Sequence, residues 1–96
     1  MKESRLQRQI IDYLDSIGAY TLNVYGSGMT GKGTPDILAC YKGLFIAIET
    51  KVGNNRLEPA QKIIRKRIIE AEGIHIVPYS LEQFISDFNE AVGNER

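Results

Sequence analysis

Asp36, Glu49 and Lys51 are charged residues that border apolar stretches of this 96-residue chain, and their types and spacing could support chemistry. If the segment between them folds as a β-hairpin with a two-residue turn at Lys42-Gly43, Asp36 lies directly opposite Glu49. Directly opposed residues of a hairpin share one face, with Cβ atoms about 4.5–5.5 Å apart. Lys51 shares that face with Glu49 because strand side chains alternate with a period of two. The sequence thus predicts two carboxylates and an ammonium group at one end of a hairpin.

Two opposed carboxylates repel each other, so stability alone gives no reason for this arrangement. A divalent cation removes the objection, because Mg²⁺ takes hard oxygen ligands, usually one or two carboxylates with waters and phosphate oxygens. The alternative is a surface ion-pair cluster in which Lys51 bridges Asp36 and Glu49. The residues themselves leave both interpretations open.

The stretch before Asp36, Gly-Ser-Gly-Met-Thr-Gly-Lys-Gly-Thr-Pro at residues 26–35, almost matches two nucleotide-binding signatures. Its first glycines fit G-x-G-x-x-G, and it fits the phosphate-loop pattern except at the last position, which is Gly33. Both signatures require a helix directly after the loop, because the helix N-terminus holds the phosphate. Thr34-Pro35 disfavours a helix, and an extended apolar run follows. We therefore expect no nucleotide cofactor, although a nucleotide-binding protein remains an alternative.

The elements that must position these residues follow from the spacing of apolar residues and from the turn residues. Ser4 and Gln7 fit a capping box for a first helix that Gly18 can end. A helical crossover after the hairpin predicts that the last strand lies parallel to a strand of the preceding meander. The chain should form one α/β domain over residues 1–96. The expected strands cover residues 19–25, 36–41, 44–51 and 74–79, and the expected helices begin near residues 4, 59 and 81.

Composition narrows the class of protein. The 12 basic and 12 acidic residues cancel, but six lysines and arginines lie between residues 51 and 67, opposed only by Glu58. This cluster is either a basic face for a polyanion or a solvated helix face. The absence of a signal peptide or an apolar membrane span, together with the single cysteine, Cys40, predicts a cytoplasmic protein with no membrane partner. Cys40 is expected to be a small buried residue, and His75 is expected to pack at the sheet rather than to act as a general base.

Four segments in order carry a resemblance to a known family: Gly-Thr-Pro-Asp at 33–36, an apolar hairpin, Glu-x-Lys at 49–51 and Leu-x-Pro-x-Gln at 57–61. Together they resemble the virus-type replication-repair nuclease (VRR-NUC) branch of the PD-(D/E)xK nucleases. The resemblance extends from Glu3 to the strand at Ile74. It implies a restriction-endonuclease-like α-β-β-β-α-β-α core, with a mixed four-stranded sheet flanked by helices.

The resemblance also implies roles for individual residues. Asp36 and Glu49 match the family's metal ligands, and the backbone carbonyl of Thr50 completes the set for Mg²⁺ or Mn²⁺. Lys51 matches the catalytic lysine, which assists the attacking water. Gln61 matches a supporting glutamine on the second helix, and Glu3 matches a glutamate on the first.

The activity implied is that of a structure-selective endonuclease that leaves a 5′-phosphate, with branched DNA or four-way junctions as substrate. A homodimer is expected because resolving a four-way junction requires two paired cuts. Alternatives are a nuclease acting on flaps or simple duplex DNA, and a DNA-binding module without catalysis. The candidate DNA-binding residues are Lys32, Arg56, Lys62, Arg65 and Lys66, for each of which a solvated surface role is the alternative.

Overall fold

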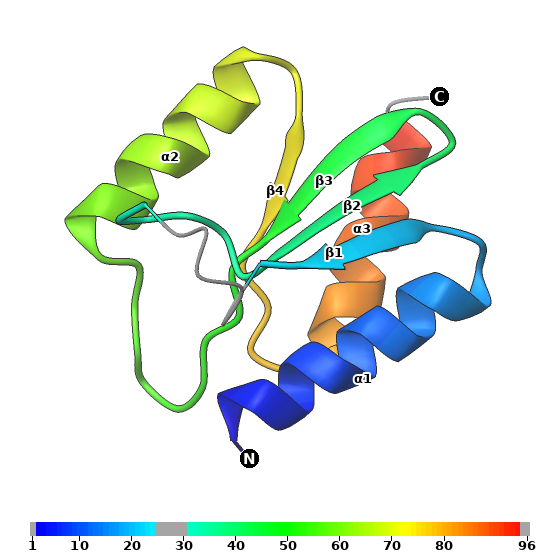
Figure 1. Cartoon of the computed structure of the whole chain (residues 1–96), viewed down its shortest axis with the longest axis horizontal. Coiled ribbons are helices and arrows are strands. Elements are labelled where there is room, and N and C mark those ends of the chain that lie inside the picture. The colour runs from blue at the N-terminus through cyan, green and yellow to red at the C-terminus, as the bar shows by residue number, and fades with distance from the viewer. Residues whose placement is uncertain (1, 25–30, 95–96) are drawn as a thin grey trace.

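The computed structural model describes residues 2–24 and 31–94 and has the predicted order of elements (Figure 1). The helices and strands follow one another in the order α-β-β-β-α-β-α, which confirms the predicted fold class. In chain order they are α1 (Glu3–Ser16), β1 (Tyr20–Asn23), β2 (Ile37–Tyr41), β3 (Leu44–Ile48), α2 (Pro59–Glu70), β4 (Ile74–Ile76) and α3 (Leu81–Asn94).

The sheet is mixed and has the strand order β1-β2-β3-β4. The first three strands are antiparallel, and β4 lies parallel to β3 as the crossover predicts. The hairpin register is also as predicted, with Tyr41 paired to Leu44. Its turn holds Lys42 at φ 51° and Gly43 at φ 84°, the positive dihedrals that a tight hairpin turn needs.

The core lies between one face of the sheet and two helices. α1 packs against β1, β2 and α3, and α3 packs against β4. Figure 1 shows α1 and α3 on one side of the sheet and α2 on the other, where it packs against β4. None of the described helices has the length and apolar character needed to span a membrane. The buried core comprises Leu6, Ile10, Leu14, Ile37, Ala39, Ile46, Ile48, Ile74, Ile76, Phe84 and Phe88.

Two expectations about the first helix and first strand are wrong. α1 begins at Glu3, one residue before the predicted cap, and no side chain caps it. The Ser4–Gln7 capping box does not form, because Gln7 is buried and bonds elsewhere. The first strand was expected over residues 19–25, but β1 covers Tyr20–Asn23, and Tyr20 is 72% exposed. Its side chain lies on the sheet face that α1 and α3 do not cover.

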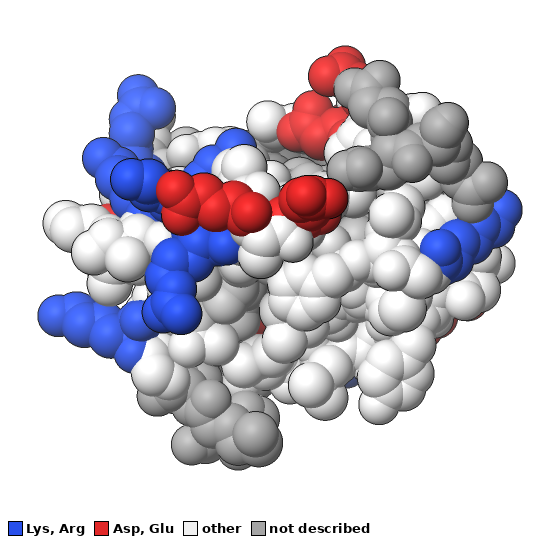
Figure 2. Space-filling view, turned by 90° about the horizontal axis from the view of Figure 1, so that it is seen from above, with Lys and Arg blue, Asp and Glu red and all other residues white. Residues whose placement is uncertain are grey.

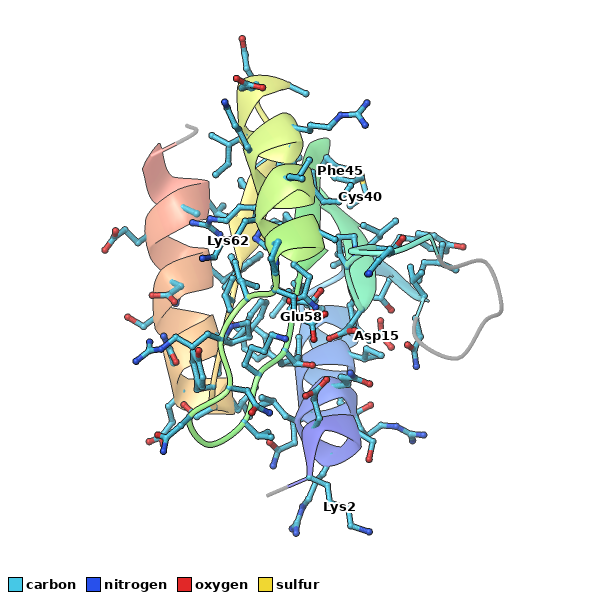
Figure 3. The ribbon with its side chains drawn as sticks, turned by 90° about the vertical axis from the view of Figure 1, so that its left-hand side faces the viewer. Lys2, Asp15, Cys40, Phe45, Glu58 and Lys62 are labelled. Carbon is cyan, nitrogen blue, oxygen red and sulfur yellow. The ribbon has the colours of Figure 1, made fainter. Side chains whose placement is uncertain are left out.

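Cys40 is likewise exposed rather than buried. It pairs with Tyr20 on one side and with Phe45 on the other, so it lies on the same face, the one that α1 and α3 do not cover. Figure 3 shows Cys40 and Phe45 close together on the strands beyond α2. Strand propensity predicted the element correctly, but burial depends on which face the helices cover.

Candidate active site

The sheet hydrogen bonds fix the backbone of Asp36 and Glu49 at one end of the hairpin. Asp36 immediately precedes β2, and its N–H donates to the carbonyl of Ile48 at 3.0 Å. Its own carbonyl accepts from the N–H of Val24 at 2.9 Å. Glu49 follows β3 and donates its N–H to the carbonyl of Ile76 at 3.0 Å. Because Ile37 pairs with Ile48, the ladder places Asp36 opposite Glu49, as the hairpin count predicts.

Both carboxylates are buried, and separate polar side chains orient them. Oδ2 of Asp36 accepts from the backbone N–H of Thr50 at 3.0 Å and from its hydroxyl at 2.8 Å. Oε2 of Glu49 accepts from Nε2 of Gln61 at 3.0 Å. Oε1 of Glu49 is fully buried and has no hydrogen-bond partner among the described residues. A buried carboxylate oxygen without a donor needs either a proton or a cation.

Gln61 reaches Glu49 because of how α2 begins. Pro59 occupies the first helical position, where its missing N–H costs no hydrogen bond. Oε1 of Gln61 accepts from the backbone N–H of Glu58 at 2.8 Å in a capping box. The two bonds of its amide thus connect the start of α2 to Glu49. The sequence predicted a supporting role for Gln61, and the structure shows its contact to be with a carboxylate.

The pKa of Glu49 is raised to about 8, chiefly by burial and next by the negative charge of Asp36. The Lys51 ammonium acts in the opposite direction, whereas the charge of Glu3 adds to the increase in pKa. Burial and the charge of Asp36 also raise the pKa of Glu3. The site therefore places three carboxyl groups near the ammonium group of Lys51, which favours the protonated form of Glu49 in the metal-free protein.

Lys51 is buried beside these carboxylates, and its backbone N–H donates to the carbonyl of Pro78 at 3.1 Å. Its charge lowers the pKa of both Glu49 and Glu3. The hydrogen bonds that hold the carboxylates come from Thr50 and Gln61 rather than from Lys51. This arrangement differs from an exposed ion-pair cluster, because the three charged groups are buried and one carboxylate oxygen is free.

Glu3 lies at the first turn of α1, where it is partly buried and senses the charges of Asp36 and Lys51. Within residues 2–24 and 31–94, no three acidic, histidine or cysteine side chains are grouped so that they could hold a metal ion. Two carboxylates and a backbone carbonyl are thus the donors available. Glu3 as a metal ligand stays a prediction.

The described part of the glycine-rich loop packs against the start of α2. Gly33 has a φ of 85°, and a Cβ added there would lie 2.5 Å from the carbonyl oxygen of Ala60. Only glycine permits this approach. A strand, β2, follows the loop instead of a helix, so neither nucleotide signature has the helix that it requires. Gly26 and Gly28 lie outside the described residues.

Basic side chains gather over α2, on one side of the molecule (Figure 2). Lys62 and Lys66 are exposed there, as predicted. Arg65 is different, because its Nη1 lies 2.8 Å from Nδ1 of His75 and 2.9 Å from the carbonyl oxygen of His75. Burial and the Arg65 charge lower the pKa of His75 to about 4, so the ring is neutral near pH 7. His75 is buried in β4, as expected.

The candidate DNA-binding residues lie around hollows beside α2. Arg56 and Lys62 line a cavity of about 620 Å³ between α2, β4 and α3. Figure 3 shows Lys62 pointing from α2 toward α3. Lys32 lines a second, smaller hollow against the first turn of α2, next to Pro59 and Ala60. Exposed cations therefore lie on two sides of this helix.

Comparison with solved structures identifies the class of fold. A chain described as a VRR_NUC domain superimposes with a TM-score of 0.76 and 21% sequence identity, covering 91% of this chain and 94% of that chain. The fold is therefore that of a VRR-NUC domain, as the motifs predicted.

The family follows from a second comparison. The model of the archaeal Holliday junction resolvase (Hjc) family matches residues 1–75, and the chain belongs to this family. It is accordingly a nuclease domain. No curated protein matches the chain.

Proposed function

We propose that this protein is a divalent-metal-dependent endodeoxyribonuclease that cuts branched DNA such as four-way junctions. The observation that carries this proposal is the buried pair of Asp36 and Glu49, in which Oε1 of Glu49 has no hydrogen-bond partner within the described part of the chain. A carboxylate pair of this kind is costly for a fold without a bound cation. Membership of the Hjc family supports DNA junctions as the substrate.

The donors present fit Mg²⁺ or Mn²⁺. Glu49 offers its unpartnered oxygen, Asp36 offers the oxygen that Thr50 does not engage, and the Thr50 carbonyl is the third candidate ligand. When bound, such an ion polarises the scissile phosphate and lowers the pKa of a coordinated water. An all-oxygen donor set of carboxylates and a carbonyl matches the preference of these cations.

Lys51 supplies the fixed positive charge of the site. Its backbone is held by Pro78, and its ammonium lies near enough to influence both Glu49 and Glu3. From this position we assign it to orienting the attacking water and stabilising the negative charge that develops on the phosphate oxygens. Gln61 keeps Glu49 in one orientation through its 3.0 Å bond.

The cations around α2 provide the electrostatic surface for DNA. Lys62 and Lys66 are exposed on the helix, and Arg56 lies in the loop that leads from Lys51 to α2. Phosphate contacts from such residues fix the position of nucleic acid without reading its sequence. We assign Arg65 a smaller share in DNA binding, because its guanidinium is bound to His75.

We propose that the active form is a homodimer. One active site cuts one strand, and symmetrical resolution of a four-way junction requires two cuts related by a two-fold axis. Two copies of this domain satisfy that requirement. Analytical ultracentrifugation with and without junction DNA tests the assembly, and a monomer on saturated junction DNA would contradict it.

The decisive experiment compares labelled four-way junctions, flaps and linear duplexes, each with Mg²⁺, Mn²⁺ or a chelator. We expect paired cuts in the junction with either metal and none with the chelator. Asp36→Ala, Glu49→Ala and Lys51→Ala should each abolish cleavage while DNA binding persists. Asp15→Ala is the matched control, because Asp15 is an exposed carboxylate that also accepts a threonine hydroxyl.

Each alternative predicts a different result. Preferential cutting of flaps or duplexes would replace the junction assignment with a nuclease of another specificity. Binding without cutting under every metal condition would identify a DNA-binding module. Cleavage by purified Asp36→Ala at the wild-type rate would refute the assigned site.

A further inference from the structure

A buried chain of polar groups runs from helix α1 to the carboxylate of Asp36. Nε2 of Gln7 lies 3.0 Å from the Thr50 hydroxyl, which in turn lies 2.8 Å from Oδ2 of Asp36. Gln7 is 3% exposed and Thr50 is fully buried. Their positions in the sequence are 43 residues apart, so this contact exists only in the folded chain.

The donor and acceptor of each hydrogen bond in this series follow from the chemistry of the groups. A carboxylate oxygen can only accept, so the Thr50 hydroxyl donates its single hydrogen to Asp36. The hydroxyl oxygen then accepts from Gln7, whose amide nitrogen can only donate. Thr50 also donates its backbone N–H to the same oxygen of Asp36. Oδ2 therefore receives two hydrogen bonds from one residue, while Gln7 fixes the rotation of the hydroxyl.

A glutamine at this position is unfavourable for packing alone. Its neighbours on the buried face of α1 are Leu6, Ile10 and Leu14, all fully buried. Burying an amide among apolar side chains costs free energy unless its hydrogen bonds are made. An apolar residue would suit this face of the helix equally well. The polar side chain therefore needs a reason, and the hydrogen bond of its amide leads to the candidate site.

We propose that Gln7 and the Thr50 hydroxyl are positioning residues that hold Asp36 in the orientation required to bind the divalent cation. This inference rests on the proposed metal-dependent function. Thr50 would thus have two roles, since its backbone carbonyl is a candidate metal ligand and its hydroxyl orients Asp36. Gln7 acts through Thr50, so a residue of helix α1 helps to orient Asp36.

The test measures Mn²⁺ binding directly, by calorimetry and by the metal-induced rise in unfolding temperature, in the absence of DNA. Thr50→Val keeps the shape of the side chain but removes the hydroxyl, and we expect its Mn²⁺ affinity to fall about 10- to 100-fold. Thr50→Ser restores the hydroxyl and should recover most of the affinity. Gln7→Met keeps the length of the side chain without its amide, and we expect its Mn²⁺ affinity to fall about 10-fold.

A double-mutant cycle separates positioning from general destabilisation. Because Gln7 acts only through the hydroxyl, Gln7→Met should weaken Mn²⁺ binding in the wild type and have no further effect in Thr50→Val. Thr21→Val is the matched control, since the Thr21 hydroxyl donates to Asp15 at 2.9 Å at an exposed position. It should leave Mn²⁺ affinity unchanged. If Thr50→Val does not fold, Gln7→Met carries the test.

The outcomes distinguish failure of this inference from failure of the metal site. If Asp36→Ala loses Mn²⁺ binding while Thr50→Val and Gln7→Met bind as the wild type does, the hydrogen bonds are structural only and the positioning role is overturned. If the losses of Mn²⁺ affinity from Gln7→Met and Thr50→Val add up in the double variant, Gln7 does not act through the Thr50 hydroxyl, and the proposed series of hydrogen bonds from Gln7 through Thr50 to Asp36 is overturned. Unchanged Mn²⁺ affinity in Asp36→Ala would refute the metal site and this inference together.

Discussion

The raised pKa of Glu49 makes the stability of the metal-free protein depend on pH in an unusual direction. The carboxyl titrates at about 8 in the fold, against an ordinary value of 4.5. Between these values the folded protein holds a proton that the unfolded chain has lost, so stability falls as pH rises. The stabilising contribution is complete below pH 4.5 and is lost as the pH passes 8.

The magnitude follows from the linkage relation. Each pH unit within the window changes the free energy of unfolding by about 1.4 kcal/mol, and the change levels off around the folded pKa. From pH 6.5 to pH 9, Glu49 should therefore cost the metal-free protein about 2 kcal/mol. His75 has its pKa lowered to about 4, so its own contribution has the opposite sign and lies mainly below pH 6.5.

Urea unfolding in the presence of a chelator, at pH 6.5 and at pH 9, measures this difference. Glu49→Gln is the matched variant, because the amide has the same shape and does not titrate. Subtracting its pH dependence from that of the wild type removes the contributions of His75 and all other groups. Mn²⁺ should reverse the wild-type loss at high pH, since the ionised carboxylate is the ligand. The same pH dependence in wild type and Glu49→Gln would refute the buried, proton-binding state of Glu49.

Further predictions concern α2, its loop and the hairpin. Gln61→Ala should slow cleavage about 10- to 100-fold with DNA affinity unchanged, and cutting at the wild-type rate would show that Gln61 only begins the helix. Gly33→Ala should destabilise the fold by about 1–3 kcal/mol more than Gly18→Ala in urea unfolding. Both glycines have a positive φ, but only at Gly33 would a Cβ meet backbone, so equal losses would contradict the close approach. Lys62→Ala should reduce the slope of log DNA affinity against log salt by about one, whereas Lys42→Ala at the hairpin turn should not. If Lys62→Ala has the same slope as the wild type, Lys62 does not contact DNA and this face of α2 is only solvated surface.

Local sequence determined the hairpin and the residues at its end. A two-residue turn at Lys42-Gly43 sets the register, and the register alone brings Asp36 opposite Glu49. Alternation continued past the end of β3 predicts Lys51 on the same face, and the charge of Lys51 does act on Glu49. These relations involve only neighbouring segments, so counting residues was sufficient. The order of the motifs was equally informative, and the fold they predicted is confirmed.

Local rules misjudged the burial of Cys40 and the start of α1. Cys40 was expected to be buried because it lies in an apolar strand, but α2, which lies on the same face of the sheet, packs against β4 and leaves Cys40 exposed. Gln7 matched a capping pattern, yet its amide reaches Thr50 instead. In both cases the nearby residues were compatible with either outcome, and the packing of distant elements selected one.

Only the tertiary structure decided how the carboxylates are held. Gln7 and Gln61 come from two different helices, and each reaches the end of the hairpin from its own side. The approach of Gly33 to Ala60 likewise depends on where α2 packs. The hairpin therefore specifies which groups face each other, because its pairing is local. Which polar groups orient those carboxylates depends on helix docking, because a hydrogen bond forms only when packing brings a donor within about 3 Å of its acceptor.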